Sequence, residues 1–110
     1  MTVTVRKACA MLIVTGTLFV PPADLARFVA EMRDLAGVTR KRNGNLSYDT
    51  AVLDAAAGRV LVAERWRDKA ALAAHLRAAE TAAFISRWAG RLRGDVRVYD
   101  ALNERPLPTD

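Results

Sequence analysis

The sequence predicts an α+β domain whose elements follow the order β-α-β-β-α-β. Short stretches rich in β-branched and apolar residues are typical of strands, and apolar residues recur at intervals of three and four between them, as in helices. The 110 residues are 52% hydrophobic, which is enough for the core of one domain. This order predicts one antiparallel sheet with the helices on one of its faces.

The first predicted strand, Met11–Val20, is apolar on both faces apart from Thr15 and Thr17. A strand that is apolar on both faces is normally covered on both sides. We therefore expect the helices to cover one side of this strand and a second copy of the chain to cover the other.

The first predicted helix begins at Pro21-Pro22-Ala23-Asp24, since proline fits the first turn and an aspartate complements the positive helix end. Its apolar residues follow helical spacing; they are Leu25, Phe28, Val29, Met32, Leu35 and Ala36. We expect the helix to end at Asn43-Gly44, where glycine can supply a left-handed residue. The run Arg40-Lys41-Arg42 is then interpreted as a solvated helix end.

The second half of the chain repeats this alternation of strand and helix. Leu46–Leu53 and Arg59–Trp66 are predicted to pair as antiparallel strands because the connection between them is short. Asp68–Leu92 is predicted to be helical in at least two pieces, with Asp68 as N-cap, and Val96–Leu102 to be the last strand. The complete order is that of a ferredoxin-like sandwich, with the domain at residues 11–102.

Residues 1–10 are interpreted as a lead-in to the first strand and residues 103–110 as a tail. The apolar segment after Arg6-Lys7 resembles part of a secretion signal, but Thr15, Gly16 and Thr17 interrupt it and no cleavage site follows. The segment is also too short to span a bilayer as a helix. We therefore expect a cytoplasmic protein that does not bind a membrane.

Charge and cysteine content limit the classes of function. The net charge is +5, but the arginines are scattered and the basic run lacks interleaved aromatic residues, so we expect no nucleic-acid partner. Cys9 is the one cysteine, which rules out an internal disulfide, and no base lies near it in sequence. With one histidine and one cysteine, the chain has no metal-binding motif and no predicted cofactor.

One stretch brings chemically useful side chains together. Glu64 and Trp66 share a face of their predicted strand, and His75 follows on the apolar side of the next helix. The end of the strand and the helix after it can therefore direct a carboxylate, an indole and an imidazole towards one place. Each residue also has a structural interpretation: His75 as a half-buried histidine bonded to the backbone, Glu64 as part of a salt bridge at a dimer contact, Trp66 as core.

Several segments together resemble the antibiotic biosynthesis monooxygenase family, which includes small quinol and anthrone oxygenases without cofactors. These segments are V14-T15-G16-T17-L18, P22 to F28, N43-G44-N45-L46-S47-Y48, E64-R65-W66, H75-L76 and A83-F84. The similarity covers about residues 11–102. Many family members carry a second histidine shortly after the first, where this chain has Ala78-Ala79-Glu80.

The resemblance implies a homodimeric α+β barrel with one pocket per subunit between the sheet and the helices. It also implies oxidation of a small electron-rich aromatic, a hydroquinone or an anthrone, by O2. His75 would then act as base or proton shuttle, Glu64 would orient it or a water, and Trp66 and Tyr48 would orient the substrate. The pocket would be lined by apolar side chains: Phe28, Met32, Leu72, Phe84 and Trp88.

Three other functions stay open at this point. An isomerase or lyase of the same fold would use the acid–base pair without oxygen, and a haem-binding protein would use His75 as axial ligand. A non-catalytic RNA-binding module shares the element order. Its stacking aromatics are missing from the third strand before Trp66.

Overall fold

Four strands form one antiparallel sheet, in which the two strands next to each other at the centre are the first and the third. In the computed structural model, which describes residues 10–108, the sheet has the order β2-β3-β1-β4. The strands are β1 (Met11–Phe19), β2 (Asn45–Asp54), β3 (Arg59–Trp66) and β4 (Arg93–Ala101). This arrangement confirms the predicted ferredoxin-like fold. Cys9 and most of the predicted lead-in lie outside the described residues.

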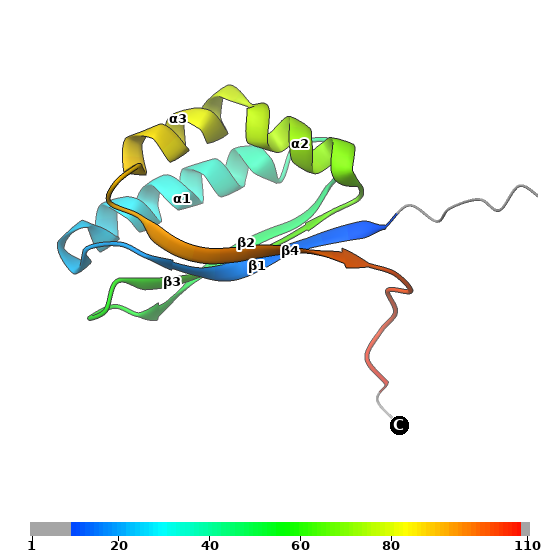
Figure 1. The fold of residues 1–110 in the computed structure, drawn as a ribbon, viewed down its shortest axis with the longest axis horizontal. Helices are drawn as coiled ribbons and strands as arrows, with labels where there is room; N and C mark the ends of the chain where they lie inside the picture. The colour runs from blue at the N-terminus through cyan, green and yellow to red at the C-terminus, as the bar shows by residue number, and fades with distance from the viewer. Residues whose placement is uncertain (1–9, 109–110) are drawn as a thin grey trace, which may run out of the picture.

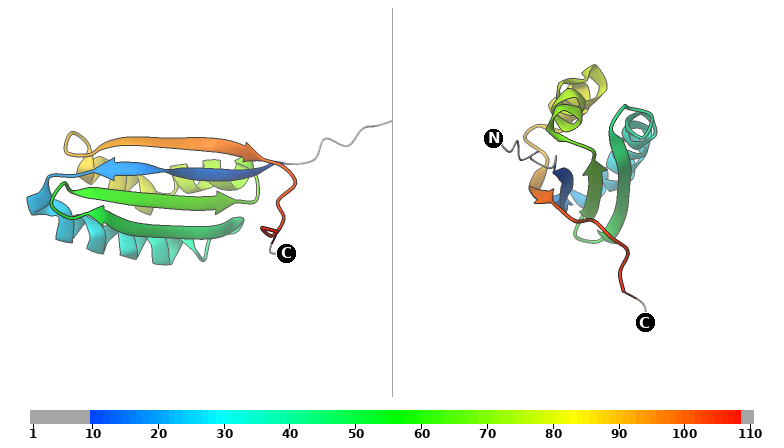
Figure 2. Two further views of the ribbon diagram at one scale, coloured as in Figure 1. Left: turned by 90° about the horizontal axis from the view of Figure 1, so that it is seen from below. Right: turned by 90° about the vertical axis from the view of Figure 1, so that its right-hand side faces the viewer.

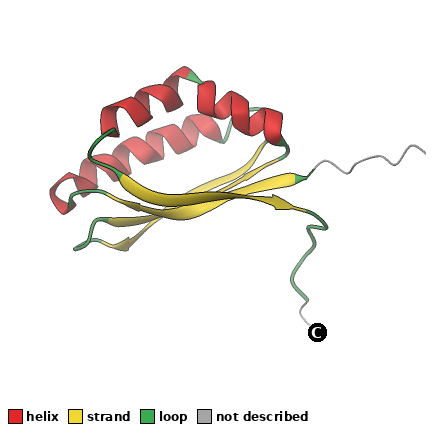
Figure 3. Ribbon diagram, viewed as in Figure 1, coloured by secondary structure: helices red, strands yellow, loops and turns green. Residues whose placement is uncertain are grey.

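The helices lie together on one face of the sheet (Figures 1 and 3). A short 3-10 turn, η1 (Pro22–Asp24), leads into α1 (Leu25–Thr39). The second helical stretch is divided into α2 (Lys69–Arg77) and α3 (Ala79–Trp88), because Ala78 between them is extended, with ψ 143°. The prediction of at least two helical pieces in this stretch was correct.

Helix α1 ends four residues earlier than predicted. After Thr39 the backbone switches to tighter bonds, and the N–H groups of Lys41 and Arg42 donate to the carbonyls three residues before them. Gly44 does adopt a left-handed conformation, with φ 85°, but it closes the turn and not the helix. A Cβ at this position would lie 2.4 Å from the Cβ of Ala71, so glycine is also required for space.

The pairing register decides which residues face the helices. Leu12 on β1 pairs with Trp66, and Tyr48 on β2 pairs with Glu64, so these four side chains share the helix-covered face. The three from β2 and β3 converge near the end of the sheet over which α2 passes. This register positions the candidate site.

The core consists of two clusters under the helices. The larger one includes Phe28, Met32, Val60, Val62 and Trp88, and the smaller one contains Leu12, Trp66 and Ala71. The opposite face of the sheet is not covered by any helix of the described residues (Figure 2). The two faces of β1 therefore have different surroundings: the helices cover one face, and the other belongs to the open surface of the sheet.

Candidate active site

Strand β3 carries Glu64 and Trp66 side by side on the helix-covered face, two residues apart. The indole Nε1–H of Trp66 donates a 2.9 Å hydrogen bond to Glu64 Oε1. Trp66 is completely buried and Glu64 is 8% exposed, so this donor partly replaces the water that the carboxylate loses on folding. The second carboxylate oxygen, Oε2, receives no hydrogen bond from residues 10–108.

Helix α2 supplies His75, and the start of this helix is fixed by the predicted N-cap. Asp68 Oδ1 accepts a 2.9 Å hydrogen bond from the backbone N–H of Ala71. Two turns later, the imidazole of His75 packs on the indole of Trp66, with ring centroids 4.7 Å apart and a tilt of 32°. Its Nε2 lies 3.9 Å from Glu64 Oε1. The predicted convergence of carboxylate, indole and imidazole is therefore present.

Tyr48 completes the cluster from the neighbouring strand. It pairs with Glu64 across β2 and β3, and its ring centroid lies 6.0 Å from that of His75. Its hydroxyl has no hydrogen-bond partner among the described residues. Burial, and then the nearby Glu64 carboxylate, raise the pKa of Tyr48 well above its usual range, so the hydroxyl keeps its proton and can donate a hydrogen bond to a ligand.

Burial shifts the pKa values of Glu64 and His75 in opposite directions. The pKa of Glu64 is raised from its usual 4.5, because loss of water penalises the charged form more than the bond from Trp66 stabilises it. The pKa of His75 falls from 6.5 to about 4, through burial first and the positive charge of Arg42 second. At neutral pH the imidazole is therefore uncharged. The site combines a carboxylate of increased basicity with a neutral histidine.

Arg42 is a member of this cluster that the sequence interpretation missed. Its guanidinium Nη1 lies 2.5 Å from His75 Nδ1 and donates a 2.8 Å bond to Thr81 Oγ1. Its Nη2 donates a 3.0 Å bond to Glu80. The basic run was predicted to be a solvated helix end, but this side chain is only 18% exposed. Nothing in the local pattern separates Arg42 from Lys41; only the turn after α1 directs it inward.

The apolar residues predicted to line a pocket are divided between two places. Leu72 packs against the cluster that contains Trp66. The other four belong to the larger core cluster: Phe28, Met32, Phe84 and Trp88. Phe28 contacts both Phe84 and Trp88, with ring centroids 5.5 and 5.0 Å away. Their role as pocket residues stays a prediction.

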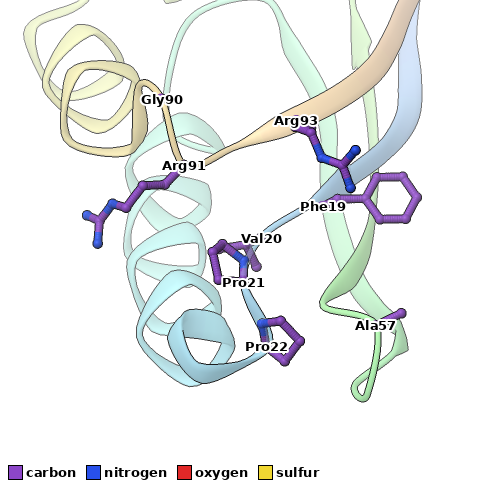
Figure 4. A pocket seen from close by; sticks show the side chains of 8 residues that line it. All are labelled: Phe19, Val20, Pro21, Pro22, Ala57, Gly90, Arg91 and Arg93. Carbon is purple, nitrogen blue, oxygen red and sulfur yellow. The ribbon is translucent and has the colours of Figure 1, made fainter.

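One hollow between the described residues lies beside the buried cluster, and another lies at the far end of the sheet. A groove of about 600 Å³ between α1 and α3 has Arg42 and Glu80 in its wall, so it borders the cluster from outside. Another, of about 360 Å³, lies among Phe19, Pro21, Ala57 and Arg93 (Figure 4). Phe19 pairs with the first residue of β3, so this second hollow is at the opposite end of the sheet from Trp66.

Two further properties concern metals and membranes. Within residues 10–108 no three His, Cys, Asp or Glu side chains gather closely enough to hold a metal ion. None of the helices described is both long and apolar enough to cross a bilayer.

A four-stranded antiparallel sheet with helices on one face is the ferredoxin-like α+β fold. A profile of the antibiotic biosynthesis monooxygenase family matches residues 11–87. The chain therefore belongs to this family, as the sequence resemblance indicated. The match includes the strands and helices that carry Tyr48, Glu64, Trp66 and His75.

Solved structures share the fold. A provisionally named antibiotic biosynthesis monooxygenase from Deinococcus radiodurans has a TM-score of 0.79 and 21% identity, over 89% of this chain and 99% of that one. A similarly named protein from Nitrosomonas europaea has a TM-score of 0.77 and 16% identity, over 89% and 96%. The PA3566 protein from Pseudomonas aeruginosa is 25% identical, with a TM-score of 0.75 over 88% and 99%. A comparison with curated proteins gave no match.

Proposed function

We propose that this protein is a cofactor-independent monooxygenase that oxidises a small electron-rich aromatic, of the hydroquinone or anthrone type, with O2. Membership of the monooxygenase family supports the reaction class. The observation that carries the proposal is the buried pair Glu64 and His75, 3.9 Å apart and surrounded by aromatic side chains. Such a pair can move a proton away from solvent water.

The chemistry requires one proton transfer to start it. A neutral phenol or anthrone reduces O2 slowly, whereas the anion left after deprotonation donates an electron readily. For an anthrone, the CH2 group loses both hydrogens, one oxygen atom becomes the new carbonyl and the other leaves as water. The protein must therefore supply a base and hold the aromatic ring near it.

The aromatic residues of the site suit the second task. The protonated hydroxyl of Tyr48, which has no partner among residues 10–108, lies next to the acid–base pair and can donate a hydrogen bond to a substrate oxygen. The indole N–H of Trp66 is already bonded to Glu64, so its role is to hold that carboxylate and to present a ring face. The expectation from the sequence was that Trp66 orients the substrate, and a ring face without the indole N–H can still serve that role.

The substrate and a second chain are further parts of the proposal. We expect a homodimeric α+β barrel, in line with the doubly apolar first strand, in the cytoplasm, without a nucleic-acid or membrane partner. A haem-binding role is disfavoured by the donor set, because Nδ1 of His75 faces Arg42 and Nε2 faces Glu64.

Oxygen consumption tests the proposal. The purified protein in chelator-treated buffer is mixed with anthrone or a naphthohydroquinone, and O2 uptake is followed with an electrode while the quinone is measured by absorbance. We expect a rate above the uncatalysed one that falls at least about tenfold in His75→Ala and in Tyr48→Phe. The matched control is Tyr99→Phe, a half-exposed tyrosine on β4, which should keep the full rate.

Two results would contradict the proposal. If neither probe is oxidised faster than in buffer, the oxidative function is wrong for these substrates. If the protein instead converts an aromatic substrate to an isomer or a cleavage product under anaerobic conditions, with no quinone formed, the same acid–base pair serves an isomerase or lyase, the alternative that the pair itself allows.

A further inference from the structure

The contacts of His75 raise the question of which group in the site accepts a proton. The imidazole has two ring nitrogens, and residues from three different segments face them. Arg42, from the turn after α1, lies at Nδ1 together with Thr81 from α3. Glu64, from β3, lies at Nε2. These surroundings determine which nitrogen carries the proton of the neutral ring.

The chemistry of the guanidinium alone decides the protonation of the ring nitrogen that faces Arg42. A guanidinium has five N–H donors and no acceptor, and it keeps its charge in proteins. At 2.5 Å from Arg42 Nη1, the Nδ1 atom must therefore be the acceptor, with its lone pair directed at the arginine. Thr81 Oγ1 accepts a bond from the same Nη1 and lies 3.4 Å from Nδ1, so it holds the guanidinium in place.

The other side of the ring follows from this. A neutral imidazole with a free lone pair on Nδ1 has its hydrogen on Nε2. That hydrogen is on the side of Glu64 Oε1, 3.9 Å from Nε2. Protonation of Nδ1 would place a positive charge directly against that of Arg42. Glu80, the carboxylate that pairs with Arg42, is 57% exposed on the outer side and compensates this repulsion only weakly. His75 consequently has no lone pair available for a substrate proton.

We propose that Arg42 is a positioning residue that fixes His75 as the Nε2–H tautomer, and that Glu64 is the proton acceptor of the site. Only the role of Glu64 as proton acceptor rests on the proposed function; the tautomer of His75 does not. The proton of the phenol or anthrone passes to Glu64 Oε2, the oxygen without a hydrogen bond from the described residues. The substrate bond to hydrogen breaks, the carboxyl O–H forms, and the substrate anion that remains is the species that O2 oxidises.

The roles of the neighbours are then distinct. Trp66 holds Oε1 of Glu64 through its indole N–H, which leaves Oε2 to the substrate. His75 Nε2 lies 3.9 Å from Glu64 Oε1, beyond hydrogen-bond distance, so its N–H would act as a donor to the negative charge that develops on the bound substrate. Tyr48 remains the second donor. The site would therefore have one base and three donors around it, with Arg42 outside the reacting atoms.

The tautomer can be measured directly because the chain contains one histidine. In ¹⁵N-labelled protein at pH 7, long-range ¹H–¹⁵N correlation of the imidazole distinguishes the protonated from the unprotonated nitrogen. We expect the pyridine-type signal on Nδ1 and the pyrrole-type signal on Nε2. In Arg42→Met the fixing donor is lost, and we expect a mixture or the reverse tautomer, since Thr81 Oγ1 can then accept from Nδ1.

The matched control is Arg40→Met, two residues away in the same turn. Arg40 donates to the backbone carbonyl of Tyr48 and does not contact His75, so this variant should keep the wild-type tautomer. A wild-type spectrum with hydrogen on Nδ1, or an unchanged spectrum in folded Arg42→Met, would overturn the positioning role. Backbone spectra and circular dichroism of each variant verify folding. Should Arg42→Met not fold, the wild-type spectrum alone still decides the tautomer.

Kinetics test the second part with the oxidised probe substrate. We expect Glu64→Gln to reduce kcat/KM by at least about 100-fold, within the range for loss of a general base. His75→Gln should lose less than His75→Ala, because the amide N–H can replace the Nε2–H donor. Equal losses in both histidine variants together with an active Glu64→Gln would show that His75 is the base. Absence of any wild-type activity would refute the proposed function and leave the tautomer result valid.

Discussion

Single residues in this protein derive their chemistry from burial more than from their own type. Glu64 and His75 would both be ordinary titrating groups at a surface. In the buried layer between sheet and helices the pKa of Glu64 rises and that of His75 falls to about 4. The indole bond to Glu64 and the guanidinium at His75 then determine the direction in which each group can exchange a proton.

The shifted histidine predicts how stability depends on pH. Folded His75 binds its proton more weakly than the unfolded chain does, so below pH 6.5 protonation favours the unfolded chain. Its contribution is therefore present at neutral pH and is lost as the pH falls from about 6.5 to about 4. We expect this loss to be about 1 to 3 kcal/mol, from the size of the shift.

Urea unfolding at several pH values measures the contribution of His75. It is the difference in unfolding free energy between a chain with His75 and the His75→Gln variant. Glu64 titrates in the opposite sense, since its raised pKa favours the folded state as the pH falls. To remove the titration of Glu64 from the comparison, the Glu64→Gln substitution is made both in the chain with His75 and in the His75→Gln variant. A difference in unfolding free energy that is the same at pH 7 and pH 4.5 would contradict the pKa of His75.

At the scale of the elements, tight connections fix how the strands and helices approach each other. The turn between β2 and β3 contains Gly58, whose φ is 67° and whose carbonyl accepts a 3.0 Å bond from the N–H of Val20. A Cβ there would lie 1.9 Å from the carbonyl oxygen of Val20. This contact secures the end of β1 to the neighbouring hairpin.

Two glycines of opposite surroundings give a matched pair of predictions. Gly58→Ala should destabilise the protein by roughly 2–4 kcal/mol, because alanine is strained at positive φ and clashes with the backbone. Gly37→Ala should stabilise it by about 0.5–1 kcal/mol, since Gly37 lies within α1 with nothing within 4 Å of its Cβ position. Thermal or denaturant unfolding measures both. Equal effects of the two substitutions would contradict this account of the turn.

For the whole molecule, the open face of the sheet is the feature that points to a partner. Within residues 10–108 helices cover one face only, and the edge strand β4 is exposed on both: Val98 is 57% and Tyr99 is 51% exposed on opposite sides. The central strand β1 contributes Ile13 to the open face, next to Tyr99 in register. A second chain placed there would cover the apolar surface that β1 presents away from the helices.

A pair of identical substitutions tests this homodimer. Ile13→Glu places a charge on the inner strand β1 of the open face and should shift the protein from dimer to monomer at micromolar concentration. Ile85→Glu on α3 is the control, because Ile85 is 52% exposed on the helical layer. Size-exclusion chromatography with light scattering gives the mass. A wild-type monomer, or a dimer that survives Ile13→Glu, would show that the open face is not the interface.

The residue pattern was sufficient for much of the fold. Alternation and helical spacing are local properties, so they predicted the strands, the helices and their order. The N-cap at Asp68 and the left-handed Gly44 were also correct, because each depends on one side chain or its absence. The predicted end of α1 was wrong because hydrogen bonds of the following turn compete with the helical ones. Which set forms depends on the residues that the turn contacts.

The candidate site was predicted in part for the same reason. Glu64 and Trp66 are two residues apart on one strand, so their shared face follows from the period of a strand, and His75 lies on the apolar side of the next helix. Arg42 comes from a turn 33 residues earlier in the chain, and only the packing of α1 beside α2 and α3 directs its guanidinium at the imidazole. The sequence alone predicted that Glu64, Trp66 and His75 meet. The tertiary structure alone added Arg42 and decided which atoms of these groups are free, since distance and burial between distant segments are set by the packing of the whole domain.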